Sequence, residues 1–206
     1  MEQRDVYFFD QPGADNTPRV IKAVLSRTKE GDITKVLVAS ETGRLALEVK
    51  KRMPRQIVVC VTFNQEARTM YKKADLLKKD LEARGIITVD TVKEPLAREL
   101  TMRNWWERKN VDLPGESADL FWMTLICVGG HGLRTAVEIV FMAVEAGVVK
   151  VGDRIIAVAG TARGADSALV MNATRFEDAV GEQPMGRMKI EEILAMPKVT
   201  EWSGYG

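Results

Sequence analysis

Apolar and polar residues follow two different patterns along this chain. Five short segments are continuously apolar and end at charged or turn residues: TKVLVAS, QIVVCVT, IITVD, DRIIAVAG and SALVMNA. Continuous apolar runs are typical of strands that are buried on both faces. The longer segments between them carry apolar residues every three or four positions, which is typical of amphipathic helices. Strands alternating with helices predict an α/β domain with a mostly parallel sheet.

Four further segments complete this pattern. DVYFF predicts a short strand, and Thr17 followed by Pro18 predicts the start of a helix with Thr17 as its N-cap. Residues 117–128 and 133–147 indicate two apolar helices separated by GGHG. MKIEEILAMP, near the C-terminus, fits a strand or a short helix, and the sequence leaves both open.

Size and charge limit the classes of partner. A chain of 206 residues, 46% of them hydrophobic, can bury a core without disulfides or metals, and we expect one domain over residues 1–206. Its 30 basic and 29 acidic residues leave a formal net charge of +1. This balance gives no broad field that would draw the protein to nucleic acid or to an anionic membrane. We therefore expect neither partner.

Cysteine and histidine are scarce. Cys60 and Cys127 each lie in an apolar run, so we interpret them as small core residues rather than metal ligands or a redox pair. His131 is the single histidine, which argues against a histidine-based metal site. The N-terminus lacks the apolar stretch of a signal peptide, and no continuous apolar run reaches the roughly 18 residues of a membrane span. We expect a soluble cytoplasmic protein without a bound metal.

The segment VASETGRLAL changes from strand to helix across Ser40, Glu41, Thr42, Gly43 and Arg44. The first amides of a helix have no intrahelical partner, and the helix dipole adds partial positive charge there. Two hydroxyls, a glycine and an arginine at this point favour a phosphate site beyond the strand's carboxyl end. The alternative is local: Thr42 caps the helix, Gly43 relieves crowding, and Glu41 repels a phosphate unless it points away.

A second loop with similar chemistry, GTARGAD, joins two predicted strands. Gly160 and Gly164 flank Thr161 and Arg163 and allow backbone amides to face an anion. The Arg163 guanidinium has the planar fork that suits a phosphate. Asp166 either binds a ligand hydroxyl or caps the amides of its own loop. A tight connection that holds no ligand is the alternative for the whole segment.

Glu138 and His131 are candidates for proton transfer. Glu138 lies in the apolar segment TAVEIVFMAV, where a carboxylate without a partner is costly. It either faces a polar cleft, where its pKa would be raised, or forms a buried pair with Arg134 one turn earlier. His131 lies among the glycines of GGHG, either in a ligand-facing loop or as an ordinary turn residue.

Two long segments, ETGRLALEVKKRMPRQIVVCVT and VGDRIIAVAGTARGADSALVM, resemble parts of the C-terminal domain of pyruvate kinase. The chain is also similar to a stand-alone archaeal and bacterial family that is labelled pyruvate kinase alpha/beta domain protein. The motifs of that family are matched at residues 7–17, 137–143, 147, 160–166 and 196–197. The resemblance covers nearly the whole chain.

This resemblance implies a three-layer α/β/α sandwich with a mostly parallel sheet and an antiparallel edge strand. It also implies a bound phosphate at residues 40–44 and flavin mononucleotide (FMN) as the cofactor. The chain departs from the family at residues 62–65, where Thr62-Phe63-Asn64-Gln65 stands in place of a histidine- and glycine-containing segment, and at residues 92–116. Thr62 is therefore a further ligand candidate. In pyruvate kinase the reaction takes place on a separate barrel domain, so we expect no such activity here.

Three functions remain open from sequence alone. The chain binds a phosphorylated small molecule, or it is a flavin-dependent oxidoreductase in which Glu138 or His131 moves protons, or it regulates a partner enzyme as a detached domain. Trp105 and Trp106 favour packing or a subunit contact, and we expect a homo-oligomer. Fold analogy does not choose among these functions.

Overall fold

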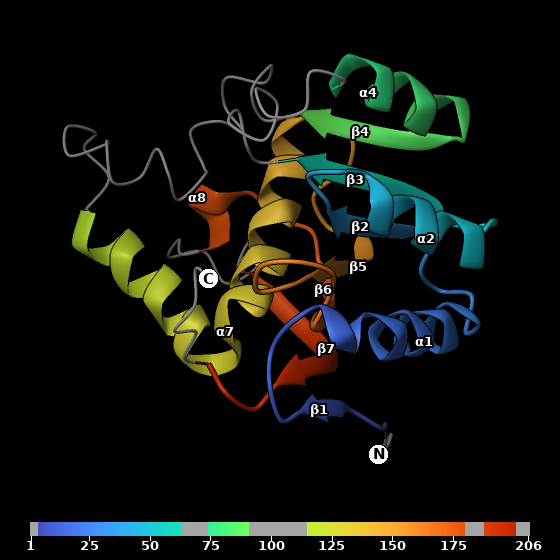
Figure 1. Ribbon diagram of the computed structural model, residues 1–206. Helices are drawn as coiled ribbons and strands as arrows, with labels where there is room; N and C mark the ends of the chain where they lie inside the picture. The colour runs from blue at the N-terminus through green and yellow to red at the C-terminus, as the bar shows by residue number, and fades with distance from the viewer. Residues whose placement is uncertain (1–3, 63–73, 91–114, 180–187, 201–206) are drawn as a thin grey trace.

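The computed structural model describes residues 4–62, 74–90, 115–179 and 188–200 (Figure 1). Its strands are β1 Tyr7–Phe9, β2 Lys35–Ala39, β3 Ile57–Thr62, β4 Ile86–Asp90, β5 Arg154–Ala159, β6 Ser167–Asn172 and β7 Lys189–Pro197. Its helices are the 3-10 turn η1 Ala14–Asn16, α1 Thr17–Thr28, α2 Arg44–Arg52, α4 Ala74–Ala83, α7 Gly115–Glu145 and α8 Phe176–Ala179.

The described strands form one sheet in the order β1-β7-β6-β5-β2-β3-β4. Strands β5, β2, β3 and β4 run parallel to one another, and β1 runs parallel to β7. Strand β6, third from the β1 edge, is antiparallel to both β5 and β7. The prediction of a mostly parallel sheet is confirmed.

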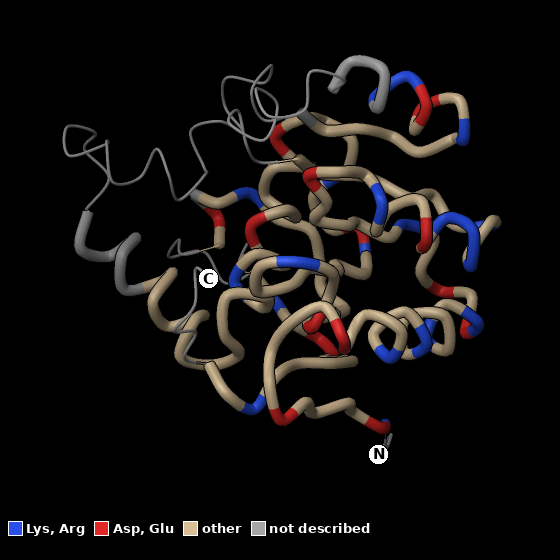
Figure 2. The backbone as a smooth tube through the Cα atoms, viewed as in Figure 1, with Lys and Arg blue, Asp and Glu red and all other residues tan. Residues whose placement is uncertain are grey.

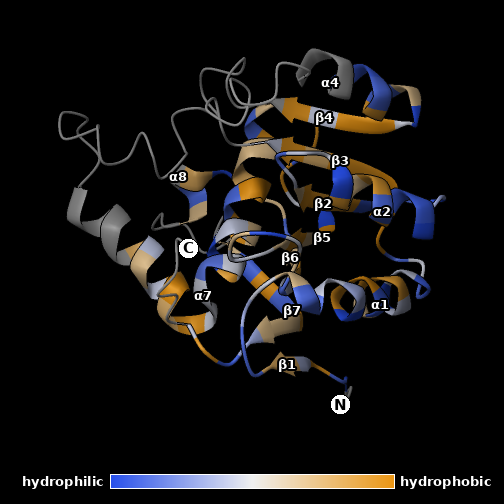
Figure 3. Ribbon diagram, in the orientation of Figure 1, coloured by the Kyte–Doolittle hydropathy of each residue, from blue (hydrophilic) through white to orange (hydrophobic). Residues whose placement is uncertain are grey.

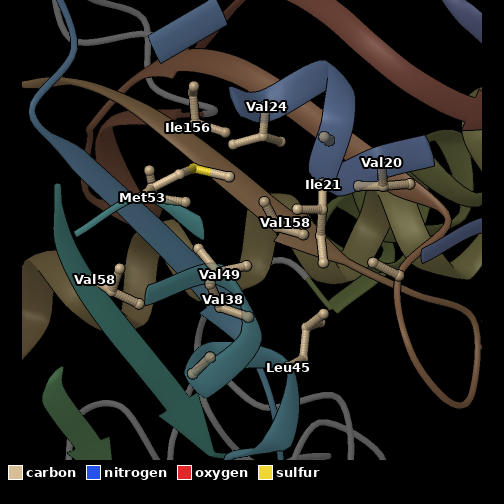
Figure 4. Close-up of a cluster of buried hydrophobic side chains, with 14 of the residues drawn as sticks. Val20, Ile21, Val24, Val38, Leu45, Val49, Met53, Val58, Ile156 and Val158 are labelled. Carbon is tan, nitrogen blue, oxygen red and sulfur yellow. The ribbon is translucent and has the colours of Figure 1, made fainter. Parts of the chain in front are cut away.

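Helices cover both faces of this sheet. Helices α1, α2 and α4 pack on one face, and α7 packs on the other. Val36 and Val38 contribute to the first core, whereas Leu37 between them contributes to the second. This two-sided burial explains why the strands are continuously apolar. Figure 3 shows it as hydrophobic strands between helices that are hydrophobic on one side, and Figure 4 shows the core under α1 and α2.

Two apolar helices lie on either side of the glycines of GGHG, as predicted, and the element α7 joins them across a kink. Gly129 and Gly130 leave helical geometry, and Gly130 has a φ of +74°. A Cβ on Gly129 would lie 2.3 Å from a methyl carbon of Leu133, so the kink leaves no room for a side chain there. The helix ends where expected, because Gly147 follows it with a φ of +69°.

Phe121–Glu145 is the segment of the described chain that is long and apolar enough to cross a membrane. Counting continuous apolar runs in the sequence does not find this segment, because glycines, Arg134 and Glu138 interrupt it. In the fold, 72% of its apolar window is buried. That burial is typical of a core helix in a soluble domain, since a membrane-spanning helix turns its apolar side chains towards lipid.

Two local predictions have clear outcomes. MKIEEILAMP contains a strand, β7, rather than a helix. Thr17 as the N-cap of α1 is wrong, because the N-cap is Asn16, which makes no side-chain capping bond. The Thr17 hydroxyl instead donates to the Ala14 carbonyl oxygen at 2.6 Å and accepts from the Ala165 amide at 2.9 Å. Thr17 thus bonds to Ala165, which is distant in sequence, instead of capping the first amides of its own helix.

A cluster of charged residues joins the end of α1 to the starts of β5 and β7. The Arg27 side chain, only 2% exposed, donates to Asp32 at 2.7 Å and to Glu192 at 2.9 Å. Arg154 contacts the same two carboxylates. Figure 2 shows acidic and basic segments together where α1 leads towards β2. The hydrogen bond from Arg27 holds the pKa of Asp32 well below its ordinary value.

Replacing Arg27 with Ala should lower the free energy of unfolding by roughly 2–4 kcal/mol at pH 7, because two partly buried carboxylates lose their main partner. Arg84→Ala is the matched control, since its pair with Asp80 is exposed and contributes about 0.5 kcal/mol or less. Urea unfolding of both variants measures the difference.

The same comparison has a defined pH dependence. Because the pKa of Asp32 is lowered in the folded protein, its contribution is complete above the ordinary value of 3.8 and is lost as the pH falls below it. The deficit of Arg27→Ala should therefore shrink between pH 7 and pH 3. Equal stability of Arg27→Ala and Arg84→Ala at pH 7 would contradict this account of the cluster.

Candidate functional site

The carboxyl ends of β3, β2 and β5 lie side by side at one edge of the sheet, because Ala39 pairs with Val61 and Val38 pairs with Val158. The chain leaves β2 towards β3 and β4 with α2 and α4 on one face. It then returns over the opposite face as α7 and enters β5, on the other side of β2. The boundary between β2 and β5 is thus a topological switch point, where open parallel sheets bind ligands.

The loop after β2 leads into α2 without a side-chain cap. Gly43 is the N-cap residue, with a φ of +67° that favours glycine, and among the described residues the helix start has no side-chain capping bond. The alternative in which Thr42 caps the helix is therefore wrong. The first intrahelical bond runs from the Leu47 amide to the Gly43 carbonyl oxygen at 2.9 Å. The Gly43 amide donates to the Ser40 carbonyl oxygen at 3.4 Å, whereas the amides of Arg44, Leu45 and Ala46 have no partner within the helix.

The start of this loop is anchored to β3. The buried Ser40 donates its amide to the Val61 carbonyl oxygen at 3.0 Å, and its own carbonyl oxygen accepts from the Cys60 thiol at 3.4 Å. Burial, with a smaller effect of the Glu41 charge, raises the pKa of Cys60 to about 12. Glu41 and Thr42 are half-buried. Thus the backbone of the loop is fixed before the helix begins.

Two of the sequence candidates border this loop. Arg44 is exposed at the first position of α2. Thr62 ends β3, and its hydroxyl contacts the Val89 carbonyl oxygen of the neighbouring strand at 3.4 Å. Both lie at the carboxyl edge of the sheet. Phe63, Asn64 and Gln65, which follow Thr62, lie outside the described residues.

The loop after β5 is organised by Asp166, which is completely buried. One carboxylate oxygen accepts from the Thr161 amide at 3.0 Å and from the Gly13 amide at 2.9 Å. The other accepts from the Ser167 hydroxyl at 2.9 Å. Of the two roles open for Asp166, the structure shows capping of its own loop. A ligand hydroxyl has no access to it in this conformation.

The outer part of this loop faces solvent. Ala162, Arg163 and Gly164 are exposed, and their amides make no hydrogen bond to another described residue. Gly164 has a φ of +68°, and a Cβ on Gly160 would lie 2.5 Å from the Gly164 carbonyl oxygen, so both glycines are required by the turn. The loop therefore folds its inner side onto Asp166, while Arg163 and the unbonded amides of residues 162–164 lie in its exposed part.

Glu138 is accounted for as half of a buried ion pair. Its carboxylate lies 2.7 Å from Nη2 of Arg134, and the two side chains are 2% and 10% exposed. The Arg134 guanidinium also lies 5.4 Å from the centre of the Trp122 ring. The structural alternative raised from sequence is the one observed, and nothing in it places Glu138 at the switch point.

His131 begins the second half of α7 and lies near Asp166, on the edge of the sheet that carries both loops. Burial, together with the charge of Arg134, holds the pKa of His131 below its ordinary value, and the Asp166 charge only partly opposes this. His131 and Glu138 are two helical turns apart. The described structure therefore does not assemble them into one acid–base pair.

The structure brings both glycine-arginine loops to one edge, as the sequence candidates require. Sequence reasoning missed Gly13 and Thr17, whose contacts with the second loop span about 150 positions and leave no local signal. Trp105 and Trp106 lie outside the described residues. Among the described residues, no group of three or more His, Cys, Asp or Glu could hold a metal ion.

Comparison with known proteins points to one family. The family model described as pyruvate kinase, alpha/beta domain, matches residues 19–171. A crystal structure of a pyruvate kinase from Cryptosporidium parvum is similar at 16% sequence identity with a TM-score of 0.38. That match covers 79% of this chain but 23% of the pyruvate kinase chain, so this chain spans less than a quarter of it.

The two cysteines should react very differently in the native protein. Cys60 is buried with a raised pKa, so it carries almost no reactive thiolate. Cys127 is exposed, so its interpretation as a core residue is wrong. Iodoacetamide at pH 8 should label Cys127 alone, and both cysteines after unfolding in urea, as peptide mass spectrometry would show. Rapid labelling of Cys60 in the folded protein would contradict the anchoring of residues 40–43 on β3.

Proposed function

Because the chain belongs to the pyruvate kinase alpha/beta domain family, we propose that it binds a phosphorylated small molecule at the β2–β5 switch point, with FMN as the ligand. The observation that carries this proposal is the start of α2, which has a left-handed glycine and no side-chain cap at the edge where open sheets bind ligands. A phosphate there would accept the first amides of the helix and interact with its dipole.

Charge supports the same ligand. Arg44 extends from the first turn of α2, and Arg163 from the loop after the neighbouring strand. Neither has an ion-pair partner among the described residues, and both are exposed. Guanidinium groups form paired hydrogen bonds with phosphate oxygens, so two of them beside an uncapped helix favour a terminal phosphate over a neutral ligand.

The residues present fit the phosphate end of FMN, since amides and arginines are the donors that a phosphomonoester requires. The choice of a flavin over a sugar phosphate rests on the resemblance to the stand-alone family. When bound, FMN would supply a redox-active ring. The described residues would bind and orient its phosphate, and the separation of His131 from Glu138 gives no support for a catalysed reaction.

We make three further proposals, on the protein's location, its oligomeric state and its partners. We propose that it acts in the cytoplasm, that it forms a homo-oligomer, and that neither nucleic acid nor a membrane is its partner. The near-zero net charge supports the last of these, because electrostatic attraction to both is weak. We also propose that this domain does not catalyse the pyruvate kinase reaction, which the family resemblance assigns to a separate barrel domain.

Titration with FMN, riboflavin and inorganic phosphate tests the proposal. The protein should quench FMN fluorescence on binding and should bind riboflavin much more weakly, because riboflavin lacks the phosphate. Arg44→Ala and Arg163→Ala should each weaken FMN binding about tenfold, the effect of losing one charge-assisted hydrogen bond.

Arg55→Ala is the control for these variants, because Arg55 is also exposed but precedes β3, at the opposite edge of the sheet. It should leave FMN affinity unchanged. Riboflavin binding as tight as FMN would contradict a phosphate site. Equal losses in all three arginine variants would point to overall charge rather than to the switch point.

A further inference from the structure

The N-terminal turn and the loop after β5 form one interlocked unit. The Thr17 hydroxyl accepts a hydrogen bond from the Ala165 amide at 2.9 Å while donating to the Ala14 carbonyl oxygen at 2.6 Å. The Gly13 amide donates to the Asp166 carboxylate at 2.9 Å. The bonds from Ala165 to Thr17 and from Gly13 to Asp166 each join residues about 150 positions apart, so the turn and the loop fix one another.

The fit between these segments is close as well as polar. A Cβ on Gly164 would lie 2.3 Å from the Thr17 hydroxyl oxygen and 2.9 Å from the Ala14 Cα. On the other side, a Cβ on Gly132 would lie 2.1 Å from an Asp166 carboxylate oxygen. The base of the loop is therefore enclosed between the N-terminal turn and the second half of α7.

This enclosure divides the amides of the loop into two sets. The amides of Thr161, Ala165 and Asp166 bond inward, to Asp166 Oδ2, to Thr17 Oγ1 and to the Ala159 carbonyl oxygen. The amides of residues 162–164 lie in the exposed part of the turn and make no hydrogen bond to another described residue. A glycine-containing loop without these inner bonds would have to be ordered by its ligand, at a cost in affinity.

We propose that Thr17 and Asp166 are positioning residues for the phosphate site, holding residues 161–164 in the conformation that presents Arg163 and the outer amides to the ligand. The N-terminal turn, which lies outside the matched residues 19–171, is then part of the site. This inference rests on the proposed function and deepens it, because it adds a segment that no ligand needs to touch.

Thr17→Val tests the inference, since it removes the hydroxyl and keeps the shape of the side chain. Thr28→Val is the matched control, because it removes a hydroxyl that donates to the Leu25 carbonyl oxygen at the other end of the same helix. In the free protein, the Ala165 amide should exchange with solvent at least about tenfold faster in Thr17→Val than in Thr28→Val. This local readout does not depend on any ligand.

FMN titration of the same proteins provides the second readout. Thr17→Val should bind FMN about tenfold more weakly than the wild type, since the ligand must then order the loop. Thr17→Ser, which restores the hydroxyl, should recover wild-type affinity, and Thr28→Val should retain it. A variant that was only globally destabilised would still bind normally well below its melting temperature.

The possible results distinguish a failure of the positioning role from a failure of the proposed phosphate site. If the wild type binds FMN and Thr17→Val binds it equally well, the positioning role is overturned and the phosphate site stands. Unchanged exchange of the Ala165 amide in Thr17→Val would likewise overturn the positioning role. If the wild type binds neither FMN nor inorganic phosphate, the proposed function fails and this inference fails with it.

Discussion

The parallel pairing of β2 with β5 is the constraint on which the rest of this structure depends. It sets two segments that are about 120 residues apart, 40–43 and 160–166, side by side at one edge of the sheet. It also makes that edge a switch point, since the chain leaves β2 in one direction and returns to β5 on the other side over the opposite face. Without this pairing, each loop would be an ordinary connection between two elements.

A second requirement is that buried polar groups have partners. Asp166 is completely buried and satisfies donors from the N-terminal turn, from its own loop and from Ser167. Glu138 is satisfied by Arg134 inside α7. The start of α2 is the contrasting case, since it has no side-chain capping bond within the described part of the chain. The first amides of α2 lie at the switch point, where the proposed anion would accept their hydrogen bonds.

Much of the fold could be predicted from sequence because the signals are local. Continuous apolar runs reflect strands with helices on both faces, and Gly147 ends α7 as expected. Strand β7 could not be assigned, because Glu191 and Glu192 look out of place in a strand until Arg27 and Arg154 are seen to neutralise them. That neutralisation depends on residues more than 35 positions away.

Part of the candidate site could also be predicted from sequence, because some of its signals are local. Residues 40–44 and 160–166 show their chemistry in their own sequence, and the i, i+4 spacing of Arg134 and Glu138 already contained the observed pair. The sequence around Thr17 predicts only a local cap, because its partner, Ala165, is 148 residues away. The order of the strands, which joins the two loops, is likewise a long-range property.

Backbone amide chemical shifts during an FMN titration test the central claim most directly. The account predicts that the largest shifts fall in residues 43–46 and 161–164, whereas shifts centred on the opposite edge, around residues 55–57 and 153–154, or no shifts at all, would contradict it.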